Sequence, residues 1–95
     1  MKKEKIYKFN KVNYIIEKDD YNVFDYDLVK ELMTDYFNDY DYVMGDFAYN
    51  KLRLKGFCDK KNKKCNKTNI IDTLDSYIKD YCAYKCKWFL LKKIK

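Results

Sequence analysis

The feature that most constrains this fold lies between residues 40 and 58. Two short segments there have the pattern of β-strands, and residues typical of a tight turn separate them. The 95-residue chain has no proline, and both of its glycines, Gly45 and Gly56, lie here. If Asn50 and Lys51 form a two-residue turn, the two glycines face each other across an antiparallel hairpin. Because side chains alternate between the faces of a strand, one hairpin face is apolar and the other is mixed and charged.

Facing glycines inside a hairpin need a physical reason, because glycine weakens a strand. A strand glycine often marks a place where another part of the protein approaches the backbone closely. We expect a helix to pack over the gap that the glycines leave. A ligand that reaches the backbone there is the alternative.

A second Asn-Lys pair predicts another hairpin near the start of the chain. Residues 5–9 and 12–16 flank Asn10 and Lys11 and place their apolar side chains on one face. After an acidic connector, apolar residues over 28–40 repeat at the three-four spacing of a helix. Asp25 is placed to cap the start of that helix.

The second half of the chain predicts one more helix and one more strand. Apolar residues over about 70–84 follow the helical spacing, with Thr68 or Asn69 as the N-cap. Residues 86–94 have an apolar centre that suits an inner strand covered on both faces. The element order is ββαββαβ. We therefore expect a single α+β domain over residues 1–95, with two helices packed on a mainly antiparallel sheet.

The net charge of +6 reflects lysine use more than arginine use, since the chain has 20 lysines and one arginine. Lysine, asparagine, tyrosine and isoleucine have AT-rich codons, so part of this charge reflects genome composition. The distribution is more informative. Residues 19–46 hold nine acids and one base (−8), and residues 51–95 hold fourteen bases and four acids (+10).

The hydropathy pattern excludes a membrane span. The longest apolar runs are four residues, far below the roughly 20 that cross a bilayer. Lysines and asparagine interrupt the first residues where an export signal would need an apolar core. We expect a cytoplasmic protein.

The four cysteines do not match the spacing of a metal site. Six residues separate Cys58 from Cys65 and three separate Cys82 from Cys86, whereas structural zinc pairs are usually closer. We expect packed thiols in a reducing cytoplasm, with a reversible disulfide between Cys82 and Cys86 as the alternative. We predict no bound metal and no cofactor.

The sequence gives no support for catalysis. The chain has no histidine, no glycine-rich phosphate loop and no nucleophile elbow. Asp46 lies beside Lys55 and Arg53 in the predicted hairpin, where we expect a cross-strand ion pair on a solvated face. We therefore predict no catalytic residues and no enzyme.

Nucleic-acid binding is the leading functional hypothesis, with RNA or the ribosome as the target. Cations track phosphates, and aromatic rings on an open sheet stack on bases. Lys87 and Lys93 are expected to join the site from the last strand, and a solvated lysine surface is the alternative. The proposed nucleic-acid-binding residues are Arg53, Lys55, Phe57, Lys60, Lys61, Lys63 and Lys64.

A protein–protein adaptor is the competing class. The chain has eleven tyrosines, more than one small core easily hides, and tyrosine is enriched at interfaces. An acidic setting would select a basic partner protein. The sequence leaves the oligomeric state open. The proposed partner-binding residues are Tyr36, Tyr40, Tyr42, Asp46 and Tyr49.

The tyrosine-rich Gly-Asp segment 40–49, the Leu-Arg-Leu-Lys-Gly-Phe segment 52–57 and the segment 74–91 resemble the YutD-like family of small bacterial proteins. The resemblance covers about residues 24–93. It implies a small cytoplasmic α+β fold and supplies no activity. This chain has Asn50 and Lys85 where the family pattern has glycine.

Overall fold

A five-stranded antiparallel sheet forms the centre of the protein in a computed structural model that describes residues 5–48, 50–63, 69–81 and 87–94. No helix in these ranges is long and apolar enough to cross a membrane. The predicted order ββαββαβ and the α+β class are confirmed. In chain order the elements are β1 (Ile6–Phe9), β2 (Val12–Lys18), α1 (Tyr26–Leu32), the 3-10 helix η1 (Asp35–Asp39), β3 (Tyr42–Ala48), β4 (Lys51–Phe57), the 3-10 helix η3 (Ile71–Thr73), α2 (Leu74–Tyr81) and β5 (Trp88–Ile94).

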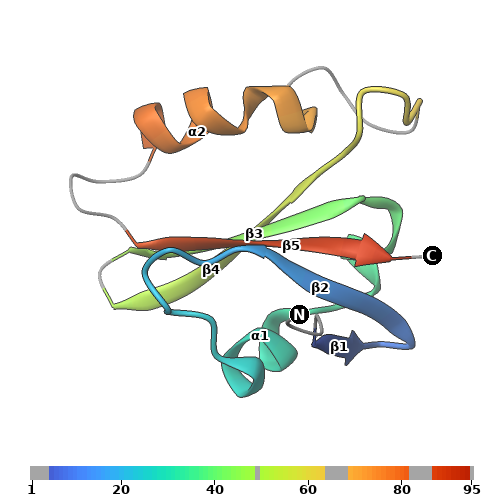
Figure 1. The fold of residues 1–95 in the computed structure, drawn as a ribbon, viewed down its shortest axis with the longest axis vertical. Coiled ribbons are helices and arrows are strands. Elements are labelled where there is room, and N and C mark those ends of the chain that lie inside the picture. Colours follow the sequence, from blue (N-terminus) through green and yellow to red (C-terminus); the bar gives the residue numbers. More distant parts are fainter. Residues whose placement is uncertain (1–4, 49, 64–68, 82–86, 95) are drawn as a thin grey trace.

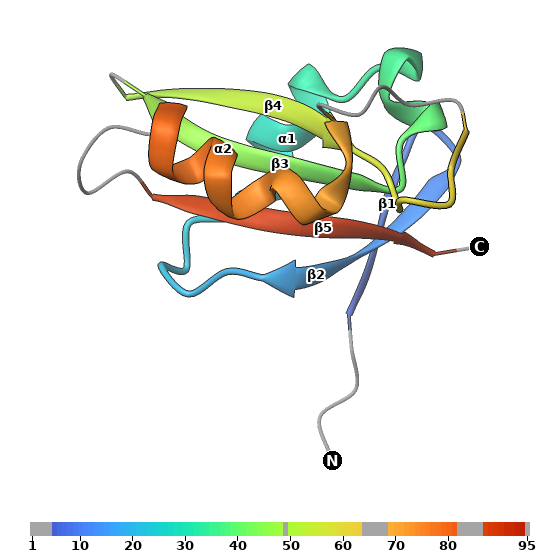
Figure 2. The ribbon, with the colours of Figure 1, turned by 90° about the horizontal axis from the view of Figure 1, so that it is seen from above.

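The two helices cover opposite faces of the sheet (Figure 1). Figure 2 shows α2 lying across β3 and its neighbours, with β1 and β2 to one side. Apolar side chains therefore form a core on each side of the sheet. The core on the α1 side contains Phe9, Tyr14, Val29, Met33, Phe37, Val43, Phe89 and Leu91. The core on the α2 side contains Met44, Phe57, Leu74 and Leu90.

The last strand of the chain, β5, lies in the middle of the sheet. The strand order is β1-β2-β5-β3-β4, so β5 joins the N-terminal hairpin to the central hairpin. Phe89 and Leu91 are fully buried on the α1 side, and Leu90 is buried on the α2 side. The prediction of an inner strand covered on both faces is confirmed.

The first hairpin has the predicted register. Phe9 pairs with Val12, and Asn10 and Lys11 form the turn between them with φ angles of 50° and 68°. Positive φ at both central positions is the mark of a tight hairpin turn, and asparagine adopts it more readily than most residues. The predicted Asn-Lys turn is correct here.

The second hairpin turns one residue earlier than predicted. Ala48 pairs with Lys51, so the turn is not centred on Asn50 and Lys51, and Asn50 supplies the positive φ of 65°. Moving the turn by one residue shifts the pairing by two, and side chains alternate with period two, so every residue keeps its predicted face. The adopted register places Asp46 directly opposite Arg53.

This register also separates the two glycines, so the prediction that they face each other was wrong. Gly45 lies opposite Phe89 of β5, and a Cβ atom at position 45 would collide with that ring. A Cβ atom at Gly56 would collide with the ring of Tyr40. Aromatic rings occupy the space above both glycines, so the expected helix backbone does not lie there.

The first helix is shorter than the periodicity over 28–40 predicted. Asp25 caps its start as expected, accepting bonds from the backbone N–H groups of residues 27 and 28. The helix ends at Leu32, and Met33 has an extended backbone. The side-chain amide of Asn10 donates to the Met33 carbonyl at 2.6 Å, which takes an acceptor that a continuing helix would use. The first hairpin turn thus meets the end of α1.

The second helix begins later than predicted. Ile70 pairs with Cys58 in an isolated parallel bridge, and a 3-10 turn separates it from α2. Leu74, Tyr77 and Ile78 pack on the sheet as the predicted apolar stripe. The predicted cap Thr68 and the helix beyond residue 81 lie outside the described residues.

Alanine substitutions at the two glycines should lower the stability of the protein by unequal amounts. We expect Gly45→Ala to lower the unfolding free energy by about 3 kcal/mol and Gly56→Ala by about 1 kcal/mol, the two ends of the usual range for overpacking. Phe89 is fully buried and cannot move aside, whereas Tyr40 is only half-buried. Urea unfolding of both variants measures the difference. Equal losses would contradict this account of the close contacts.

Candidate functional site

The sheet face predicted to bind nucleic acid is covered by α2. Phe57 is fully buried, and its ring meets the ring of Tyr77 edge-on at 5.7 Å. Met44, beside it on the same face, is 1% exposed. The prediction that Phe57 stacks on bases is therefore wrong, because the apolar stripe of α2 packs where a base would have to lie.

Arg53 and Lys55 emerge on the predicted face, but both contact neighbouring groups. Arg53 donates from Nε and Nη2 to the two carboxylate oxygens of Asp46, at 3.2 and 2.7 Å. The Arg53 side chain is 50% exposed and the Asp46 side chain only 3%. The expected ion pair forms, but its carboxylate is buried and not solvated. The Lys55 ammonium lies 5.6 Å from the Phe57 ring and 5.0 Å from the Tyr77 ring.

Hydrogen bonds hold the lysine-rich loop in place where it leaves β4. The Asp41 carboxylate accepts bonds from the Asp59 backbone N–H and the Asn62 side-chain amide, at 2.9 and 3.1 Å. Lys60, Lys61 and Lys63 remain exposed, and Lys64 lies outside the described residues.

The loop lysines lie at the far end of β4 from Arg53. Lys61 and Lys63 share a cavity with Lys92 and Lys93 of β5. Lys87 directly precedes β5 at the opposite end, where its carbonyl accepts from the Phe47 backbone N–H. The predicted cations therefore form two groups and not one surface.

The predicted tyrosine surface is assembled only in part. Tyr36 is 67% exposed, and its hydroxyl shares a 3.1 Å hydrogen bond with the hydroxyl of Tyr40. The Tyr36 ring also meets the Phe37 ring edge-on at 5.0 Å. Tyr42 lines the cavity that Lys61 and Lys63 share with β5, and Asp46 is buried. Tyr49 lies outside the described residues.

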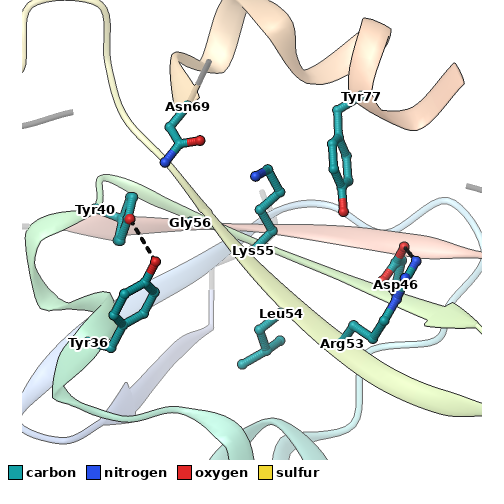
Figure 3. Close-up of a pocket in the computed structure, with 9 residues that line it drawn as sticks. All are labelled: Tyr36, Tyr40, Asp46, Arg53, Leu54, Lys55, Gly56, Asn69 and Tyr77. Atoms are coloured by element: carbon teal, nitrogen blue, oxygen red, sulfur yellow. Dashed lines mark hydrogen bonds and ion pairs between the residues drawn. The ribbon is translucent and has the colours of Figure 1, made fainter. Parts of the chain in front are cut away.

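A cavity of about 330 Å³ runs beside β4 and is shown in Figure 3. Tyr36 and Tyr40 line it from the η1 side of the strand, and Asn69 and Tyr77 line it from the α2 side. We call it the edge groove. Sequence reasoning missed Asn69 and placed Tyr77 in the core, because only the tertiary approach of residues 69–77 to β4 brings them near Tyr36 and Tyr40.

Hydrogen bonding perturbs the phenol of Tyr40 at the edge groove. The bond with Tyr36 raises the pKa of Tyr40 above its ordinary value, and partial burial adds to the shift. Asn69 acts in the opposite direction, because its bond favours the phenolate. The neutral pair of hydroxyls is therefore the form that the folded protein favours.

Cys58 is half of a disulfide, so the prediction of a packed thiol is wrong at this position. Its side chain is fully buried at the end of β4. The other three cysteines lie outside the described residues, and with them the predicted Cys82–Cys86 alternative. Among the described residues, no cluster of three or more potential metal ligands occurs.

Comparison with known proteins identifies relatives. The family model described as "Putative antitoxin YutD-like" matches residues 8–92. A Bacillus subtilis (strain 168) protein named "Putative antitoxin YutD" is 44% identical over 72 residues, which are 76% of this chain and 79% of that protein. The solution NMR structure of the protein yutD from B. subtilis has a TM-score of 0.80 and 35% identity, covering 99% of this chain and 86% of that chain. The match therefore includes the first hairpin, which the sequence resemblance left out.

The buried carboxylate predicts a stability role for Arg53. We expect Arg53→Ala to lower the unfolding free energy by about 2 kcal/mol, because it leaves the Asp46 carboxylate buried without this partner. Arg53→Lys keeps a cation and should lose less, although it cannot form the two-bond contact. Urea unfolding measures both. An Arg53→Ala variant as stable as the parent would show that the pair is dispensable.

The hydroxyl pair predicts a change in tyrosine titration. In Tyr36→Phe we expect the pKa of Tyr40 to fall toward the ordinary 10.0, because the bond with Tyr36 is the largest cause of the shift. A raised folded-state pKa contributes stability that is present below pH 10 and is lost as the pH rises through the folded pKa. The variant should therefore lose less stability above pH 10. Carbon-13 NMR of the tyrosine rings follows the titration; an unchanged Tyr40 pKa would contradict the assignment.

Proposed function

This chain belongs to the YutD-like family, and on that premise we propose that it acts by binding a partner protein in the cytoplasm, without catalysis. The family description uses the word antitoxin. A protein antitoxin that blocks its target by contact needs an exposed surface with fixed side chains. The edge groove is the surface in this chain that best fits that need.

The observation that carries this proposal is the exposed ring of Tyr36. A large aromatic side chain that is 67% exposed contributes little to the core. The hydrogen bond to Tyr40 and the edge contact with Phe37 hold this ring in place. A fixed ring loses little conformational entropy on binding, and tyrosine is enriched in interface cores.

The charge of the groove changes the predicted partner. Asp46, the one acid among the described residues that line the groove, already binds Arg53. Lys51, Arg53 and Lys55 follow one another along the same face of β4. These contacts support a partner segment that carries acidic side chains, in place of the basic partner expected from the acidic stretch of sequence.

RNA binding is a second candidate, supported by the larger cavity of about 820 Å³ near the loop. Lys61, Lys63, Lys92 and Lys93 line it, and lysines can follow a phosphate backbone. Asp39, Asp41 and Asp59 line the same cavity and would repel phosphate. We therefore place RNA after a protein partner.

Capture from a cell lysate with tagged protein, with and without nuclease, separates these candidates. We expect a protein partner to remain after nuclease treatment and to be lost with Tyr36→Ala. Interface anchors of this kind contribute about 2 kcal/mol, which is more than tenfold in affinity. Tyr21→Ala is the matched control, because Tyr21 is 50% exposed and lies outside the groove.

Two results would count against the proposal. Capture that disappears with nuclease would favour RNA. Capture that is equally strong for Tyr36→Ala and Tyr21→Ala would show that the edge groove does not bind the partner.

A further inference from the structure

The outer edge of β4 carries backbone groups that point away from the sheet. β4 is the last strand in the sheet order and pairs with β3 on one side. Just beyond it, the Cys58 N–H donates to the Asn69 carbonyl and the Cys58 carbonyl accepts from the Ile71 N–H, both at 2.7 Å. The Cys58 peptide groups therefore point outward from β3.

Because peptide groups alternate in direction along a strand, three more residues of β4 direct theirs outward. In an antiparallel strand, every second residue directs both its N–H and its carbonyl to the same side. The pairing of β3 with β4 is continuous from Ala48–Lys51 to Tyr42–Phe57. Gly56, Leu54 and Leu52 must therefore direct their peptide groups outward, as Cys58 does.

The chain already uses one end of this edge for strand pairing. Ile70 forms a parallel bridge with Cys58, so an extended segment is seated on the outer side of the strand there. The described part of the chain supplies no such segment alongside Leu52, Leu54 and Gly56. The edge groove runs beside Leu54 and Gly56, where the pairing stops.

The side chains around this edge specify what an added strand would carry. On the α2 side, Lys51 and Lys55 flank Arg53, whose charge the Asp46 carboxylate offsets, so the row keeps a net positive charge. On the other side, the row begins with Leu52 and Leu54. Figure 3 shows Leu54 and Lys55 on opposite sides of the strand. Acidic side chains would match the first row and apolar side chains the second.

The tyrosines close the apolar side of the groove. Gly56 has no side chain, and the ring of Tyr40 lies over its backbone. Tyr36 continues this wall toward solvent. An apolar residue of an added strand would therefore meet aromatic surface beside Gly56.

We propose that the outer edge of β4, from Leu52 to Gly56, binds an extended segment of the partner protein that alternates acidic and apolar side chains. The segment adds a sixth strand to the sheet, with backbone hydrogen bonds for affinity and the two side-chain rows for selection. This inference rests on the proposed function and specifies how the partner engages the edge groove.

The charge row argues against a second copy of this chain as the occupant. Two β4 strands paired edge to edge would bring Lys51, Arg53 and Lys55 of one copy beside the same cations of the other. Like charges across a strand pair are destabilising, and edge lysines commonly prevent self-pairing. The same cations attract a strand with acidic side chains.

Amide hydrogen exchange of the free protein tests the geometry first. The amides of Leu54 and Gly56 should exchange at least about tenfold faster than those of Arg53 and Lys55, which face β3. Two-dimensional NMR resolves the individual amides. Equal protection of all four would show that the edge is not open and would overturn the proposal.

A capped peptide of roughly eight residues, the length of an ordinary strand, then serves as the probe. The peptide alternates glutamate and valine. At a concentration that occupies about nine-tenths of the protein, it should slow exchange at Leu54 and Gly56 about tenfold. The first control alternates lysine and valine. The second is the glutamate–valine peptide N-methylated at every residue, which retains the side chains but removes the backbone donors.

Neither control should protect these amides at the same concentration. Equal protection by the lysine peptide would overturn the charge selection, and equal protection by the N-methylated peptide would overturn strand pairing. Leu54→Pro should abolish the protection of the Gly56 amide, because it removes the outward N–H of residue 54 without removing a bond to β3. Leu54→Ala is its matched control and should retain most of the protection. The peptide controls test the proposal without altering the protein.

The outcomes separate this inference from the proposed function. If no peptide protects Leu54 and Gly56 but lysate capture still depends on Tyr36, the added strand is wrong and the protein partner stands. If capture does not depend on Tyr36, the proposed function fails and the strand proposal loses its basis.

Discussion

The contact between the Phe89 ring and the backbone of Gly45 is the constraint on which the rest of this structure depends. Phe89 lies in the central strand and Gly45 lies directly opposite it in β3. The ring can lie there only because position 45 has no side chain. This contact fixes β5 against the central hairpin, while the other edge of β5 pairs with the N-terminal hairpin. An isolated two-stranded hairpin is marginally stable at best, so the sheet needs this junction.

The register of the central hairpin also decides how the basic residues are used. Asp46 is placed opposite Arg53 and is buried beneath α2, so the single arginine of the chain serves a structural carboxylate. Lys55 lies over two aromatic rings on the same face. A count of cations therefore overstates the positive surface that is free to meet a nucleic acid. The remaining loop lysines lie among aspartates at the other end of β4.

The edge groove arises from the position of β4 in the sheet. A strand at the edge has one row of backbone groups directed outward. Because the helical segments cover opposite faces of the sheet, Tyr36 and Tyr40 reach this edge from one side and Tyr77 from the other. Backbone donors and acceptors between aromatic walls are the combination that proteins use to bind extended peptides. The proposed recognition of an extended segment depends on this arrangement.

Local periodicity was sufficient to predict the order of the elements, the first hairpin turn, the helix cap at Asp25 and the buried central strand, because each depends on residues close together in the chain. The face of each hairpin residue was also predictable, since a two-residue shift preserves it. The register itself depended on two contacts that the sequence does not single out. Phe89 lies far along the chain from its partner Gly45. The pairing of Arg53 with Asp46 competes with equally plausible cross-strand pairings. The burial of Phe57 and the groove beside β4 depended on where α2 crosses the sheet. Spacing along a chain reveals which side chains share a face, but contacts between distant segments decide what covers that face.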